Sequence, residues 1–180
     1  MIPRLQTERL LLREYRPEDF EAFATIMADA DVQRYLPSGE PMSGIDAWRF
    51  MAASIGAWTM NGFGTWVVER KTDGAFMGRV GLIKPDGWPG LEVGWTIGRP
   101  YWGQGFATEA AAALVRYAFL THPVDEVIAT IHPENAASQS VARKLGETKG
   151  RHLEMVLGGH LYPCDVWSVS RTEWLRLQKA

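Results

Sequence analysis

Two glycines, Gly103 and Gly105, stand where an apolar, strand-like run ending at Ile97 gives way to an alanine-rich helical run over 107–120. Glycine has no Cβ, so the chain can turn tightly there and another molecule can approach the peptide N–H groups. The first four N–H groups of a helix have no partner within it, and together with the helix dipole they attract anions. The joint therefore suits an anionic group such as a pyrophosphate.

This joint differs from two common nucleotide-binding loops. The six-residue glycine spacing of a dinucleotide fingerprint is absent, and no Gly-Lys-Ser/Thr follows as in a phosphate-binding loop. A plain strand-to-helix turn, with glycines for backbone geometry alone, is the alternative interpretation.

The segment Tyr101-Trp-Gly-Gln-Gly-Phe-Ala-Thr-Glu-Ala110 resembles the pyrophosphate loop of the GNAT superfamily, the acyl-CoA-dependent N-acyltransferases. That loop reads Gln/Arg-x-x-Gly-x-Gly/Ala, and Gly105 and Ala107 match its last two marked positions, whereas Trp102 replaces Gln or Arg. The surrounding residues look like the RimJ/RimL-like branch, which includes N-acetyltransferases of ribosomal-protein N-termini. The resemblance runs from Leu10 to Trp174.

The resemblance implies acetyl-CoA as co-substrate and no metal. Its pantetheine arm would enter between the strands that end near Ile97 and Ile131 and would bond to open backbone groups like an added strand. An N–H near Ile97 could also polarise the thioester carbonyl. The cofactor-binding residues expected on this basis are Trp95, Thr96, Ile97, Trp102, Gly103, Gln104, Gly105, Phe106, Ala107, Thr108 and Asn135.

The resemblance also implies catalytic candidates. Asn135-x-x-Ser138 looks like the Asn-x-x-Ser of the branch, with Asn135 holding the pantetheine arm and Ser138 giving a proton to the departing sulfur. Plain capping of a helix start is the alternative for this pair. Glu154 is the first candidate for the base and Glu92 the second; for either, an ordinary exposed strand carboxylate is the alternative.

The expected reaction is direct attack of a neutral primary amine on the thioester. An α-amine with a pKa of about 7.8 is roughly 10–20% neutral at neutral pH, which costs about 1 kcal/mol, whereas a lysine costs about 4–5 kcal/mol. A weak base acting through water is therefore enough for an α-amine. The predicted function is N-acetylation of a small-molecule amine or a protein N-terminus. The alternatives are a catalytically silent acyl-CoA-binding module and an enzyme with a larger donor such as succinyl-CoA.

The whole chain sets bounds on these interpretations. At 180 residues it is expected to form a single domain over 1–180, and 46% hydrophobic with 22% charged residues is typical of a globular protein. The net charge of -2 argues against nucleic acid as a partner. Without a signal-like or bilayer-length apolar run, no membrane partner and a cytoplasmic location are expected. Cys164 is the single cysteine and is expected to be buried, and the four histidines form no tight pair, so no metal is expected.

Periodicity predicts the elements that position these residues. Strands are expected at 7–13, 65–70, 76–83, 91–97, 124–131, 151–157 and 162–170, and helices from Pro17, over 46–60, over 107–120 and from 133 to Gly146. Residues 29–43 are expected to be mainly a connection. A strand, helix and strand in succession imply one parallel pair. The predicted fold class is α+β, GNAT-like: a mostly antiparallel sheet whose parallel pair splays at the cofactor cleft, flanked by about four helices.

Aromatic residues add two expectations. Trp48, Trp58 and Phe63 lie where the superfamily builds its acceptor cleft, with Tyr162 in the other wall, although core packing is the alternative for most of them. The tail after Ser170, with Trp174 and Leu175, indicates some packing partner. A homodimer is therefore kept among the expected partners.

Overall fold

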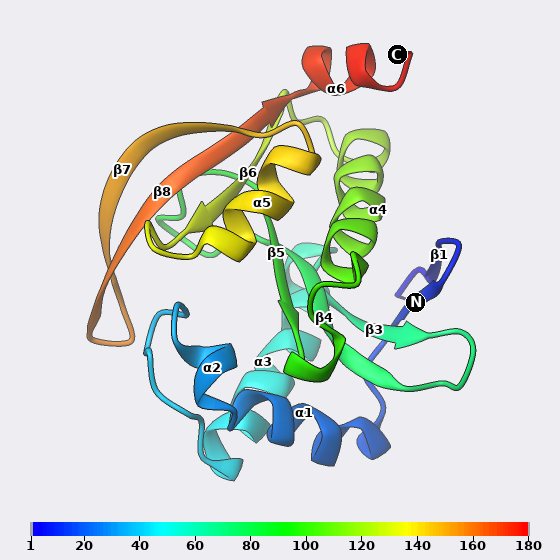
Figure 1. The fold of residues 1–180 in the computed structure, drawn as a ribbon, viewed down its shortest axis with the longest axis vertical. Helices are drawn as coiled ribbons and strands as arrows, with labels where there is room; N and C mark the ends of the chain where they lie inside the picture. Colours follow the sequence, from blue (N-terminus) through cyan, green and yellow to red (C-terminus); the bar gives the residue numbers. More distant parts are fainter. Residues whose placement is uncertain (1, 180) are drawn as a thin grey trace.

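The sheet is built mainly from strands that follow one another along the chain (Figure 1). The computed structural model describes residues 2–179, and its eight strands lie in the order β1-β2-β3-β4-β5-β6-β8-β7. Their bounds are β1 Leu5–Gln6, β2 Leu10–Arg13, β3 Thr65–Arg70, β4 Phe76–Ile83, β5 Glu92–Ile97, β6 Glu126–Ile131, β7 Thr148–Leu157 and β8 His160–Ser170. Every neighbouring pair is antiparallel except β5 and β6. The predicted mixed sheet with one parallel pair is confirmed.

Helices cover both faces of this sheet. They are α1 Phe20–Met27, α2 Ala30–Gln33, α3 Gly44–Asn61, α4 Phe106–Thr121, α5 Ala136–Lys144 and α6 Arg171–Leu177, with short 3-10 turns η1 Pro17–Asp19 and η2 Arg99–Tyr101. Successive side chains of a strand point to opposite faces. Along β3, Trp66 and Val68 pack in the cluster that contains α4, and Val67 packs with α1 and α3. The sheet is therefore a middle layer.

A bulge in β4 decides which residues face which layer. Val68 lies opposite Gly78 while Glu69 lies opposite Phe76, so Met77 is an extra residue in β4. Both Met77 and Val80 consequently join the cluster around α4. Arg79, between Gly78 and Val80, is turned to the opposite face, towards α3.

The segment 29–43 is mainly a connection, as expected, and the expectation about Trp174 is corrected. The segment 29–43 contains the one-turn helix α2, whose start is capped because the Asp29 carboxylate accepts from the Asp31 N–H at 2.9 Å. Trp174 is 8% exposed and packs against Phe119 with ring centroids 5.2 Å apart, so it completes the core instead of awaiting a partner. The four longer helices match the predicted ones, and α2 and α6 add two short helices to them.

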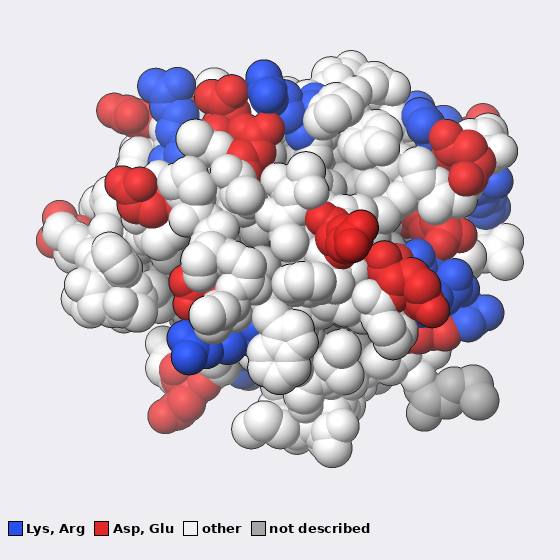
Figure 2. Space-filling view, turned by 90° about the horizontal axis from the view of Figure 1, so that it is seen from below, with Lys and Arg blue, Asp and Glu red and all other residues white. Residues whose placement is uncertain are grey.

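The surface shows no area dominated by one charge on the face at the lower end of the view in Figure 1. Acidic and basic side chains are interspersed there around an uncharged middle (Figure 2). Exposed apolar side chains occur on α3, among them Ile45, Trp48 and Met60. A homodimer stays a prediction.

None of the helices within residues 2–179 has the length and apolar character needed to cross a bilayer.

The bulge generates a stability prediction. Gly78 has a φ of 147°, and a Cβ there would lie 2.1 Å from the Thr96 carbonyl oxygen, which is rigid backbone. We expect Gly78→Ala to lower the free energy of unfolding by about 3 kcal/mol or more, because β4 and β5 must separate. Gly74→Ala is the control: its φ is 72° but nothing lies within 4 Å, so only about 1–2 kcal/mol is expected. Chemical denaturation measures both, and equal losses would contradict the prediction.

Candidate active site

The site begins where the parallel strands part. β5 and β6 are paired at a single position, Glu92 opposite Ile128, where the Ile128 N–H donates to the Leu91 carbonyl at 3.0 Å. Alternate residues of a strand bond to opposite neighbours. Since Leu91 bonds towards β6, the backbone groups of Trp95 and Ile97 face the same side, where β6 has diverged. The Ile97 carbonyl accepts from the Trp102 indole N–H at 2.6 Å. The Ile97 N–H and both Trp95 backbone groups are left facing the gap.

The glycine loop follows directly. Gly103 and Gly105 have φ values of 72° and 81°, the left-handed region that only glycine adopts readily. The Glu109 N–H donates to the Gly105 carbonyl at 3.0 Å as the first bond of α4, so the N–H groups of residues 106–108 precede any bond within the helix. Between residues 2 and 179, no acceptor is found for the N–H groups of Gly103, Gln104 or Gly105. A row of donors is therefore open at the start of α4.

Arg9 holds this loop in place. Its Nη1 donates to the Gln104 carbonyl at 3.0 Å, and its Nε pairs with Glu109 at 2.6 Å. The backbone N–H of Arg9 also donates to Glu109 at 2.9 Å, and the guanidinium lies 4.3 Å from the centroid of the Phe106 ring. Sequence reasoning missed Arg9, because nothing local marks a partner that lies far along the chain.

A cavity of about 440 Å³ runs from the strand gap to the glycine loop. Ten of the eleven residues predicted to bind the cofactor line it, namely Trp95, Thr96, Ile97, Trp102, Gly103, Gly105, Phe106, Ala107, Thr108 and Asn135. Gln104 is the exception, since its side chain donates to the Pro100 carbonyl at 3.1 Å on the surface. An elongated cavity with open donors at one end and an unpaired strand edge at the other fits a pyrophosphate followed by an amide-containing arm.

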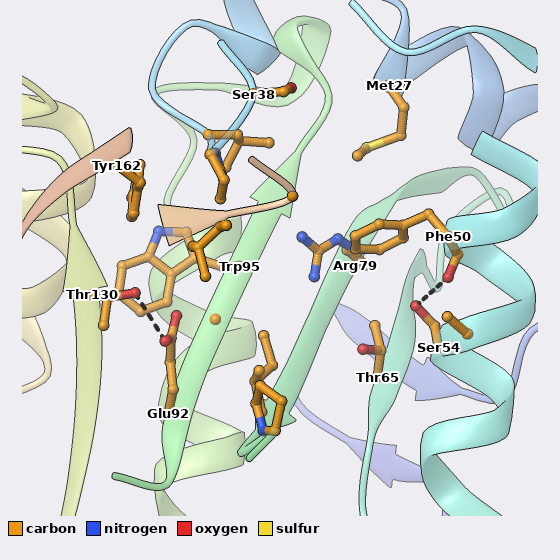
Figure 3. A pocket seen from close by; sticks show the side chains of 18 of the residues that line it. Met27, Ser38, Phe50, Ser54, Thr65, Arg79, Glu92, Trp95, Thr130 and Tyr162 are labelled. Carbon is orange, nitrogen blue, oxygen red and sulfur yellow. Dashed lines mark hydrogen bonds between the residues drawn. The ribbon is translucent and has the colours of Figure 1, made fainter. Parts of the chain in front are cut away.

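A second, larger cavity of about 790 Å³ adjoins the first along β5, where it is lined by residues 92–95 and the smaller one by residues 95–97 (Figure 3). The two cavities share Trp95, Asn135 and Ser138 in their walls, together with Tyr35 and Leu36. Asn135 caps α5 by accepting from the Ser138 N–H at 3.0 Å, which fixes both residues at this junction. The Asn135 side-chain oxygen therefore caps the helix, as the alternative interpretation expected. Asn135 and Ser138 also lie where the two cavities meet.

Glu92 is a buried carboxyl in the wall of the larger cavity. It accepts hydrogen bonds from the Trp88 indole N–H at 2.6 Å and from the Thr130 hydroxyl at 2.9 Å (Figure 3). Burial raises its pKa to about 7, and the two hydrogen bonds oppose that rise. A carboxyl with a pKa near neutrality can take up and release protons at working pH.

Comparison with known proteins assigns a family to this geometry. Residues 9–148 match the family model described as an acetyltransferase (GNAT) domain. The chain belongs to the GNAT acetyltransferase family. It is 32% identical to the uncharacterized N-acetyltransferase YnaD of Bacillus subtilis, over 79% of this chain and 81% of that protein. It is 31% identical to FsC-acetyl coenzyme A-N(2)-transacetylase of Aspergillus fumigatus, over 98% of this chain and 80% of that protein.

Solved structures agree on the GNAT fold. An acetyltransferase from Agrobacterium tumefaciens superposes with a TM-score of 0.81 at 28% identity, covering 95% of this chain and 96% of that one. The ribosomal alpha-N-protein acetyltransferase RimL, in complex with coenzyme A, superposes with a TM-score of 0.77 at 15% identity, covering 93% and 98%. The fold of this GNAT domain is thus shared with the RimJ/RimL-like branch.

Other predicted residues lie elsewhere in this GNAT domain. Glu154 is exposed on β7, opposite Pro163 of β8, and lines neither cavity. Trp58 packs edge-on against Trp66, with centroids 4.4 Å apart, and Trp48 is exposed on α3. Phe63 contacts His122 away from both cavities. Of the predicted acceptor-cleft aromatics, Tyr162 alone lines the larger cavity.

Cys164 lines neither cavity, whereas His160 lines the larger one. Cys164 is buried, and that burial, with nearby acidic groups, raises its thiol pKa to about 11. Its side chain contacts Met155 at 3.6 Å. Across residues 2–179, no group of three or more His, Cys, Asp or Glu side chains is placed to hold a metal ion.

The raised pKa of Glu92 predicts a pH-dependent stability. Between the usual carboxyl pKa of 4.5 and about 7, the unfolded chain has released a proton that the folded chain keeps. Stability must therefore fall as pH rises through this window. We expect Glu92→Gln to gain on the order of 3 kcal/mol in free energy of unfolding, relative to wild type, between about pH 4 and about pH 8.

Urea denaturation at several pH values checks this. Glu147 is also buried, and burial, followed by the charge of Glu92, raises its pKa to about 8, so Glu92→Gln also lowers the pKa of Glu147 and the measured difference includes that change. Glu126→Gln, on the exposed end of β6, should follow the wild type throughout. A constant difference between Glu92→Gln and wild type would mean that Glu92 is ionised normally.

Proposed function

We propose that this protein is an acetyl-CoA-dependent N-acetyltransferase that moves an acetyl group to a primary amine by direct attack on the thioester. The observation that carries the proposal is the junction of the two cavities. One cavity ends in open backbone donors, the other contains a buried carboxyl, and Trp95, Asn135 and Ser138 stand in the wall between them.

The donor is assigned to the smaller cavity. Its open N–H groups at the start of α4 suit a pyrophosphate, and the unpaired edge of β5 suits the amides of pantetheine. The related Aspergillus fumigatus protein is named for acetyl coenzyme A, and the structure of RimL contains coenzyme A. Both names support acetyl-CoA as the donor here.

The chemistry follows from the two polar side chains. The amine nitrogen forms a bond to the thioester carbon, the carbon–sulfur bond breaks, and the thiolate takes a proton from the Ser138 hydroxyl, which is reprotonated from water. The proton lost by the amine passes to Glu92, directly or through water. Glu92 returns to water the proton that it takes from the amine, so that the net change is one proton lost by nitrogen and one gained by sulfur. In this role Glu92 replaces Glu154, which faces away from both cavities. A base with a pKa of about 7 is matched to an α-amine at neutral pH.

A thiol-release assay tests the proposal. Acetyl-CoA or succinyl-CoA is offered with N-terminal peptides, amino acids and polyamines, and calorimetry with coenzyme A measures binding separately. Release of thiol with acetyl-CoA supports the proposal. Faster release with succinyl-CoA would assign a larger donor, and binding without release for any amine would make this a silent acyl-CoA-binding module.

Replacing Glu92 should change the rate and its pH profile. We expect kcat/KM of the wild type to rise with pH through about 7 as Glu92 ionises, and Glu92→Gln to lower it about 100-fold and keep only the rise at about 7.8 that comes from the amine itself. Glu154→Gln is the matched comparison and should keep the wild-type profile. An equal loss in Glu154→Gln would return the base to that residue.

Replacing Ser138 should separate catalysis from binding. Its hydroxyl interacts more strongly as the sulfur gains charge, so we expect Ser138→Ala to lower kcat about 10-fold while the Kd for acetyl-CoA stays within about two-fold. Ser140→Ala, on the same helix but lining only the smaller cavity, should leave kcat unchanged. An unchanged kcat in Ser138→Ala removes the proton-donor role.

A further inference from the structure

Arg79 is a buried cation in the middle of β4. It lies opposite Thr96 of β5, and the strand is otherwise apolar or glycine. The residue is 8% exposed, and its guanidinium projects into the larger cavity beside Phe50 (Figure 3). Charged side chains are rarely buried to this extent unless they are paired.

No partner of opposite charge is found for Arg79. Among residues 2–179, no carboxylate oxygen lies within 4.0 Å of its side-chain nitrogens, and its buried Nε has no hydrogen-bond acceptor. The Phe50 ring centroid lies 4.6 Å away, which gives a cation–π contact but no acceptor atom. The guanidinium donors are therefore available to something that enters the cavity.

A second buried arginine shows how this chain treats such a charge. Arg13 of β2 is 2% exposed, and its guanidinium pairs with Asp19 at 2.7 Å through two nitrogens and with Glu69 at 2.5 Å. Arg13 is thus paired directly with two carboxylates, whereas Arg79 forms no ion pair with any described residue and is attracted only at longer range by the ionised form of Glu92.

Glu92, in the same cavity, cannot fill this role. Glu92 lies opposite Ile83, four residues along β4 from Arg79, which places the two Cα positions about 13 Å apart along the strands. Its Oε2 atom accepts both the Trp88 and the Thr130 hydrogen bond, and neither Glu92 oxygen lies within ion-pair distance of Arg79. The cavity therefore has Arg79 and Glu92 at separate places in its wall, and its other lining residues include Met27, Leu36 and Leu82 together with the charged Glu40, Asp46 and Lys84, none of which forms an ion pair with Arg79.

We propose that the acceptor carries a carboxylate that pairs with Arg79, so that it is a primary amine joined to a carboxylate through an apolar body. This names the substrate class and rests on the proposed function. The planar guanidinium fork matches a carboxylate in a two-point contact. One buried positive charge balances one negative charge, which favours a carboxylate over a doubly charged phosphate.

Matched acceptor pairs test the proposal in the thiol-release assay. Glycyl-phenylalanine is compared with its C-terminal amide, and 6-aminohexanoate with 6-aminohexanamide, so that each pair differs in the carboxylate alone. We expect kcat/KM to favour the acid about ten-fold or more in the wild type. Arg79→Met should bring the acid-to-amide ratio close to one, and Arg79→Lys should restore part of the preference. Equal rates for acid and amide in the wild type would overturn the inference and leave the acetyltransferase proposal standing.

A binding measurement gives a readout besides activity. Calorimetry with 6-aminohexanoate, without acetyl-CoA, should show weaker binding to Arg79→Met than to wild type, and the amide should bind both alike. Binding of the acid that is unchanged in Arg79→Met would also overturn the inference. Absence of thiol release with every amine would count against the proposed function, while this carboxylate measurement would still decide the role of Arg79.

Thermal unfolding shows whether the variants fold. Arg79→Met should melt at or above the wild-type temperature, because an unpaired buried charge is removed. Arg13→Met is the matched control and should melt lower, because Asp19 and Glu69 lose their partner. A large drop in Arg79→Met would show that Arg79 is neutralised within the protein, which contradicts the proposal.

Discussion

The loss of pairing between β5 and β6 after one register position is the constraint on which the site depends. Strands that stayed paired to their ends would satisfy the backbone of Trp95 and Ile97 and would close the smaller cavity. Because they part, the edge of β5 is left open inside the protein. The sheet remains continuous through the pair Glu92 and Ile128, and β6 is held in place because it pairs along its whole length with β8. Pairing with β8 thus stabilises β6, while the edge of β5 that faces β6 stays open.

Buried charges are likewise treated differently in the core and at the cavity. The Arg13 network joins β2, β3 and η1 and is complete within the protein. At the cavity, Glu92 is buried with a raised pKa, and Arg79 has no anionic partner among the described residues. Burying the Glu92 carboxyl and burying the Arg79 guanidinium without an ion-pair partner each cost folding free energy. Such costs are commonly kept where a ligand or a reaction uses the unsatisfied group.

The sequence predicted the order of elements and the glycine loop because both are local signals. Period-two and period-3.6 patterns identify strands and helices, and glycines at a strand-to-helix joint identify the turn. The same patterns do not say which face of a strand meets a cavity. Glu154 and Glu92 were both strand carboxylates, and only the packing of hairpin β7–β8 turns Glu154 outwards. Arg79 was missed although a lone arginine in an apolar strand was a visible signal. Core packing, the alternative for most of the aromatic residues, is correct for Trp58, whereas Trp174 was wrongly expected to need a packing partner. Aromatic residues look alike in sequence whether they line a cleft or fill a core.

The attachment of Arg9 to Glu109 also constrains the order in which the molecule assembles. The two residues are 100 positions apart, so the contact forms only after α4 exists and the chain between has closed. The conformation of the glycine loop therefore depends on the first hairpin being docked. Conversely, a local detachment of β1 and β2 would slacken that loop while β3 to β8 stay folded. The first hairpin, β1–β2, thus stabilises the conformation of a glycine loop that lies far from it in the sequence.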